Sequence, residues 1–132
     1  MRPYKNIVLL FAALATSVAV ADATDDLILL DQQWGESGWP SGFVSEDVIS
    51  IGPAGIVGFN EMVADADAEA EAEADREEAY VVSGYQVKFL SDDIAVMVHT
   101  AAGSSPHSDL HVFQKLGDTW LVMANAAAPI TQ

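Results

Sequence analysis

Four segments with a two-residue hydrophobic period fill the C-terminal part of the chain, and they constrain the fold more than any other feature. The spacing predicts strands over residues 80–90, 94–102, 109–116 and 120–127. Short turns or loops separate them, which is typical of an antiparallel meander. Gly84 interrupts the first of these strands and is a candidate β-bulge.

Two helices are predicted before these strands. Residues 25–34 place Leu27, Leu30 and Trp34 on one apolar stripe. Residues 59–78 begin with an apolar face and continue into alternating alanines and acids. A strand would line up like charges on one face, whereas alanine and glutamate favour a helix, so we interpret this segment as one helix with a solvated second half.

The segment between the two helices is irregular. Residues 35–42 contain glycines and a proline that break the first helix, a short strand ends at Ile51, and Gly52–Gly55 form a turn. Helices that precede a meander predict an α+β domain in which the helices pack on the concave face of a curved antiparallel sheet.

The first 21 residues are typical of a cleavable signal peptide. A short basic start is followed by the apolar residues 6–21, which end in the small-x-small pattern Ala19-Val-Ala21. The alternative is a membrane anchor, but a spanning helix needs about 20 apolar residues. We therefore expect an exported protein, periplasmic or secreted, whose domain covers residues 24–132.

The charge of the chain excludes several classes of partner. Removal of residues 1–21 leaves three basic residues against 20 acidic ones, a formal net charge of −17. Such a surface repels phosphates and anionic lipids, which argues against nucleic-acid binding and, after signal cleavage, against membrane binding. The chain has no cysteine, so disulfides, thiol catalysis and thiolate metal sites are excluded.

The order of several short motifs resembles a known family. A helix bearing Trp34 precedes the turn Pro53-Ala-Gly55 and a helix with Glu61-Met-Val63; the motifs that follow are Asp92-Asp-Ile-Ala95 and Val112-Phe…Gly117-Asp-Thr-Trp120-Leu-Val122. Over residues 25–130 this order resembles the SnoaL-like branch of the nuclear transport factor 2-like superfamily. The resemblance implies a cone-shaped α+β fold, which also houses ketosteroid isomerase and scytalone dehydratase. Two features depart from it: residues 35–42 replace a short second helix, and alanines precede Pro129.

Isomerases and dehydratases of this superfamily use histidine or aspartate groups in an apolar cavity, which directs attention to His99, Asp109 and His111. By strand alternation His99 shares a face with Met97, and Asp109 shares one with His111. If the two faces coincide, a histidine beside a carboxylate can act as a general base near neutral pH. The alternative is a hydrogen-bonded histidine at the sheet edge or in a dimer contact. The three histidines and nearby Asp109 could instead bind a metal. Because His107-x-x-x-His111 crosses a loop–strand junction and matches no strong metal motif, we expect no metal and no other cofactor.

Aromatic side chains are the candidates for a ligand pocket. Trp34, Tyr85, Phe113 and Trp120 lie on elements that should cover the cone, with core packing as the alternative. Tyr85 and Asn125 can supply orienting hydrogen bonds.

Two functions follow. The first is an exported domain that binds a small hydrophobic molecule in the cone or forms a homodimer through the sheet. The alternative is a lyase or isomerase that uses a His/Asp acid–base pair on a small apolar substrate. The enzyme hypothesis requires at least two of His99, Asp109, His111 and Asn125 to meet in one pocket.

Overall fold

The computed structural model describes residues 22–73, 81–103 and 106–131. A helix over residues 22–37 comes first, and the elements that follow are β1 (Val44–Gly52), β2 (Gly55–Val57), α2 (Phe59–Glu73), β3 (Val81–Ser91), β4 (Ile94–Ala102), β5 (His107–Leu116) and β6 (Thr119–Pro129). The predicted signal peptide, residues 1–21, lies outside the described residues. No helix in the described ranges is both long and apolar enough to cross a membrane.

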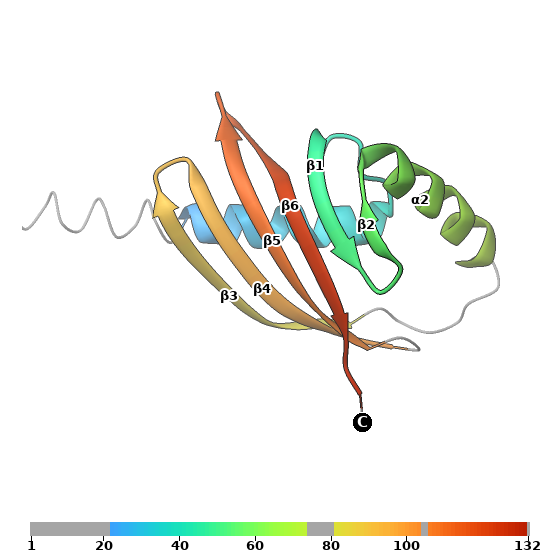
Figure 1. Ribbon diagram of the computed structural model, residues 1–132. Coiled ribbons are helices and arrows are strands. Elements are labelled where there is room, and N and C mark those ends of the chain that lie inside the picture. Colours follow the sequence, from blue (N-terminus) through green and yellow to red (C-terminus); the bar gives the residue numbers. More distant parts are fainter. Residues whose placement is uncertain (1–21, 74–80, 104–105, 132) are drawn as a thin grey trace, which may run out of the picture.

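The strands form one curved, open sheet in the order β2-β1-β6-β5-β4-β3 (Figure 1). Strands β3 to β6 pair antiparallel in sequence order, which confirms the predicted meander. Strand β1 adds to β6 in parallel, and β2 pairs antiparallel with β1 at the edge. The helix over residues 22–37 crosses one face of the sheet, which we call the inner face; the opposite face is the outer face. The predicted α+β class is confirmed.

The core lies between this helix and the inner face. Leu27 on the helix is fully buried, and Met97, Phe113 and Val122 on three neighbouring strands are buried with it. Phe59 and Met62 bring the start of α2 against the same core. Gly58 caps α2, because its backbone N–H donates to Glu61 Oε2 at 3.1 Å. The predicted apolar faces therefore meet in one core.

The element boundaries differ from the prediction in places that have local causes. The first helix runs past Trp34 to residue 37 and ends at Gly38, whose positive φ of 73° suits a left-handed cap; its N–H donates to the Trp34 carbonyl at 2.8 Å. The predicted turn Gly52–Gly55 joins β1 to the three-residue β2, which was not predicted. Strand β5 begins at His107, two residues earlier than predicted. For the predicted helix over residues 59–78, residues 74–78 lie outside the described part.

Candidate functional site

Strand register brings the predicted acid–base residues onto the inner face. His99 on β4 pairs with Asp109 on β5, and His111 on β5 pairs with Asn125 on β6. Met97, the partner of His111, lies two residues from His99 and therefore on the same face of β4. The side chains of His99, Asp109, His111 and Asn125 consequently all lie on one face of the sheet. The two faces that the sequence analysis left unassigned therefore coincide.

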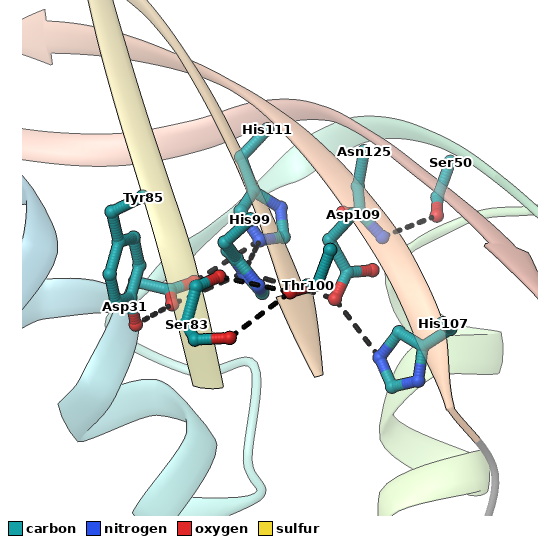
Figure 2. Close-up of polar contacts among 10 residues, drawn as sticks. All are labelled: Asp31, Ser50, Ser83, Tyr85, His99, Thr100, His107, Asp109, His111 and Asn125. Atoms are coloured by element: carbon teal, nitrogen blue, oxygen red, sulfur yellow. Dashed lines mark hydrogen bonds and ion pairs between the residues drawn. The ribbon is translucent and has the colours of Figure 1, made fainter. Parts of the chain in front are cut away.

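A residue that the sequence analysis missed completes this group. Asp31 lies on the helix over residues 22–37 and is only 6% exposed. Its Oδ1 lies 3.1 Å from His111 Nε2, and its Oδ2 lies 3.3 Å from His99 Nε2. Figure 2 shows the carboxylate reaching from the helix to both rings. The available signal was an acid in an apolar stripe, since Leu27, Asp31 and Trp34 follow i, i+4, i+7 spacing.

Tyr85 reaches Asp31 because β3 contains a bulge. The pairing of β3 with β4 shifts register between Ser83 and Gln86, and Gly84 has a φ of 73°. In a regular strand, residues three apart such as Val82 and Tyr85 lie on opposite faces. The extra residue of the bulge reverses this alternation, so both side chains point to the inner face. The Tyr85 hydroxyl donates to Asp31 Oδ2 at 2.8 Å, and its ring packs 5.2 Å from the His99 ring. The bulge predicted at Gly84 is confirmed.

The electrostatics of this cluster favour an ionised carboxylate. Burial by itself would raise the pKa of Asp31, but hydrogen bonds from His111 and His99 and the charge of His111 outweigh it and hold the pKa well below 3.8. Burial likewise lowers the pKa of His99, but the hydrogen bond and charge of Asp31 and the charge of Asp109 raise it above 6.5. Asp31 is therefore charged at neutral pH, and a proton on His99 is stabilised.

The two histidines converge through the same ring atom. Their Nε2 atoms lie 3.1 Å apart, and each lies within hydrogen-bond distance of a different oxygen of Asp31. A carboxylate only accepts, so each Nε2 donates to Asp31 when it carries a proton. The Nδ1 atoms of His99 and His111 are buried and have no hydrogen-bond partner within the described ranges. The hydrogen bonds and ion pairs of both rings with other side chains are therefore made at Nε2.

A second, more exposed pair continues the cluster outward. His107 Nε2 lies 3.0 Å from Asp109 Oδ2, and the same oxygen lies 3.8 Å from His99 Nε2. Asn125 Nδ2 donates to Ser50 Oγ at 3.2 Å, which ties β6 to the parallel strand β1. In Figure 2 these groups form a band from Tyr85 to His107.

A pocket of ≈ 690 Å³ opens onto this cluster, a size suited to a small molecule. Most of its lining is polar: Asp31, Gln32, Glu36, Glu69, His99, His107, Asp109, His111 and Asn125, with Trp34, Gly35 and Val82 completing it. All four residues named by the enzyme hypothesis line this one pocket.

The predicted ligand-binding aromatics divide between the site and the core. Trp34 lines the pocket and packs 5.4 Å from the His111 ring, and Tyr85 contributes its hydroxyl to Asp31. Phe113 is fully buried behind His111, and Trp120 packs against Phe89. Neither lines the pocket, and their position in or against the hydrophobic core fits the alternative of core packing.

Comparison with known proteins identifies the fold. The chain matches no protein-family model, and no curated protein matches it by sequence. Among solved structures, a protein from Novosphingobium aromaticivorans described as nuclear transport factor 2-like with a cystatin-like fold superposes with a TM-score of 0.72 at 14% identity, covering 89% of this chain and 88% of that one. A nuclear transport factor 2-like protein of unknown function from Silicibacter pomeroyi gives a TM-score of 0.67 at 11% identity, covering 84% and 98%.

A third similar structure, from Rhodospirillum rubrum, is described as a nuclear transport factor 2-like protein of unknown function in nutrient uptake. Its TM-score is 0.65 at 11% identity, covering 80% of this chain and 98% of that one. At these identities the likeness concerns the fold. The chain thus has the nuclear transport factor 2-like cone fold that the sequence motifs indicated.

Proposed function

We propose that this nuclear transport factor 2-like protein binds a small molecule in the cone and catalyses a proton-transfer reaction on it, a dehydration or an isomerisation. The observation that carries the proposal is the buried Asp31 carboxylate held between His99 and His111 at 3.3 and 3.1 Å, beside a pocket. A histidine oriented by a carboxylate is a competent general acid or base near neutral pH.

The chemistry divides between the two rings. One neutral imidazole takes a proton from a substrate carbon next to a carbonyl group, and the other, protonated, returns a proton to a leaving hydroxyl or a neighbouring carbon. Asp31 stabilises each imidazolium as it forms, because the pair is shielded from water. His99 is the candidate acid, since its proton is stabilised, and His111 the candidate base. Asn125 Oδ1 has no hydrogen-bond partner in the described ranges and can orient a ligand donor.

The polar lining of the pocket changes the class of ligand that we expect. Four carboxylates, those of Asp31, Glu36, Glu69 and Asp109, lie around it, whereas Trp34 and Val82 supply its apolar surface. Anionic compounds are disfavoured by this charge. We therefore propose a neutral, oxygen-bearing substrate such as a small hydroxy-ketone, in place of a purely hydrophobic one.

Deuterium exchange tests the proposal without a known product. The protein is incubated in deuterated water with a panel of hydroxy-ketones selected by thermal shift, and NMR follows exchange at the carbon beside the carbonyl. We expect exchange above the protein-free rate and its loss in His111→Gln, with Asp92→Asn in an exposed turn as the control. Binding without any exchange would refute catalysis and leave the simpler ligand-binding function.

A homodimer through the outer face is a second proposal. Side chains at Ile49, Ile51 and Ile56 are 71%, 53% and 85% exposed. The register places a continuous row on this face, formed by Ile56, Ile51, Ala126, Leu110 and Val98. An exposed apolar row of this kind favours self-association. Light scattering should give twice the chain mass and a monomer for Ile51→Glu, with Leu29→Glu on the first helix as control; a monomer at high concentration would contradict the proposal.

Export is the third proposal, and it rests on the sequence of residues 1–21. We propose cleavage after Ala21 and a periplasmic or secreted product. Intact mass and N-terminal sequencing of the protein from a secreting bacterial host should show Asp22 as the first residue. Retention of Met1 in the cytoplasmic fraction would contradict it.

A further inference from the structure

We propose that Asp31, His99 and His111 form a binding site for a divalent transition-metal ion, with zinc as the reference ion. Three buried donors from three different elements converge here: the two Nε2 atoms lie 3.1 Å apart, and the carboxylate oxygens lie 3.1 and 3.3 Å from them. No metal was expected from the sequence, because the three histidines and Asp109 match no strong metal motif. The structure brings together a different donor set, which includes the missed Asp31.

The separations fit ligands that share one ion. Zinc binds imidazole nitrogen and carboxylate oxygen at about 2.0–2.2 Å, so neighbouring ligands in a tetrahedral site lie about 3.4 Å apart, and in an octahedral site about 3 Å apart. The observed separations of 3.1–3.3 Å fall between these values. The separations are therefore compatible with one ion held by both rings and the carboxylate.

The donor types select the class of metal. Two imidazoles and one carboxylate suit zinc, cobalt, nickel or ferrous iron, whereas calcium and magnesium prefer sites made of oxygen ligands. Asp109 Oδ2, 3.8 Å from His99 Nε2, adds a second negative charge near the site. Because the cluster borders the pocket, water or a small ligand can complete the coordination.

Outer hydrogen bonds hold the carboxylate but not the Nδ1 atoms of the two rings. Tyr85 donates to Asp31 Oδ2 at 2.8 Å, the kind of outer contact that holds a ligating carboxylate in place. The Nδ1 atoms of His99 and His111 have no such partner among the described residues. Since loss of outer partners typically weakens metal binding by about 10–100-fold, we expect a reversibly bound ion instead of a permanent structural one.

The inference does not rest on the proposed acid–base function. A metal ion on both Nε2 atoms occupies the positions that protons need, so the loaded protein should lack that catalysis and the metal-free protein should retain it. Metal binding is measured directly on the protein, and deuterium exchange is measured in the presence of a chelator. Failure of one therefore leaves the other standing.

The test uses the untagged full chain, stripped with EDTA and dialysed. Titration with Co²⁺ should produce visible absorption bands that saturate at one ion per chain, and calorimetry with Zn²⁺ should give one site of micromolar affinity, with no heat from Mg²⁺. His111→Asn should weaken Zn²⁺ binding at least 30-fold, whereas His107→Asn at the rim should change it less than 3-fold. Tyr85→Phe, which keeps the ring packing, should weaken binding several-fold and serves if His111→Asn fails to fold.

Three results would overturn the inference. The first is the absence of a one-to-one site tighter than 100 μM. The second is equal weakening by His107→Asn and His111→Asn. The third is several weak sites per chain that Tyr85→Phe leaves unchanged, which is the behaviour of ions attracted to an acidic surface.

Discussion

Asp31 shows how a single side chain turns an apolar helix stripe into a polar site. It lies one turn from Leu27, which is fully buried, and one turn from Trp34, which lines the pocket. A buried carboxylate is tolerated only when hydrogen-bond donors replace water, and His99, His111 and Tyr85 do so here. These donors come from strands far away in the sequence. The helix pattern alone therefore could not show that Asp31 is buried or that it belongs to the site.

Removal of this charge should be strongly destabilising. We predict that Asp31→Asn lowers the free energy of unfolding at pH 7 by about 3 kcal/mol, because it breaks a buried ionic cluster and leaves two histidines without their common acceptor. Tyr85→Phe should cost about 1.5 kcal/mol, the value of one hydrogen bond to a charged group. Urea denaturation in the presence of EDTA measures both. The exposed turn residue Asp92 provides the control, and a loss for Asp31→Asn no larger than for Asp92→Asn would contradict the prediction.

At the scale of elements, the sequence allowed the pairing of the strands to be predicted. It did not allow prediction of the local irregularities that set the direction of individual side chains. Alternation placed His99 with Met97 and Asp109 with His111, and four consecutive strands with short connections admit few pairings. The three-residue β2 is too short to show a hydrophobic period. The first helix continues past Gly35 to residue 37, because Gly38 and not Gly35 forms its C-terminal cap. The consequence of the Gly84 bulge was also hidden, because it depends on the register with β4.

Substitutions at Gly84 test how much the backbone conformation of the bulge depends on glycine. A Cβ at Gly84 would meet only Thr100 Oγ1 at 3.8 Å, so the cost of Gly84→Ala is its positive φ of 73°, about 1–2 kcal/mol. Gly84→Asn should cost less, because asparagine tolerates the left-handed region. Gly52→Ala is the matched control, with open space around the added Cβ and no positive φ. Thermal and urea unfolding compare the three; equal stability of Gly84→Ala and Gly52→Ala would show that the bulge needs no glycine.

At the scale of the whole molecule, the two faces of the curved sheet differ in chemical character. The inner face and the first helix enclose the polar cluster, while the outer face presents the apolar row that includes Ile51 and Leu110. Composition predicted neither, because a count of residue types does not say on which face of the sheet a side chain lies. What composition does determine is the net charge, which acts on the folded molecule as a whole.

The acidity should make stability depend on salt. With 20 acidic and five basic residues in the full chain, like charges repel in the compact state, and 0.1 M salt reduces the range of this repulsion to about 10 Å. On α2, Asp65 and Glu69 are exposed and four residues apart, a destabilising like-charge spacing. We predict that raising NaCl from 20 to 200 mM increases Tm by about 3 °C, equivalent to roughly 0.5 kcal/mol for a domain of this size. The double variant Asp65→Asn/Asp67→Asn should raise Tm at low salt and show a smaller salt response. Identical salt responses of the variant and the parent would place the repulsion outside α2, and a Tm independent of salt would exclude it altogether.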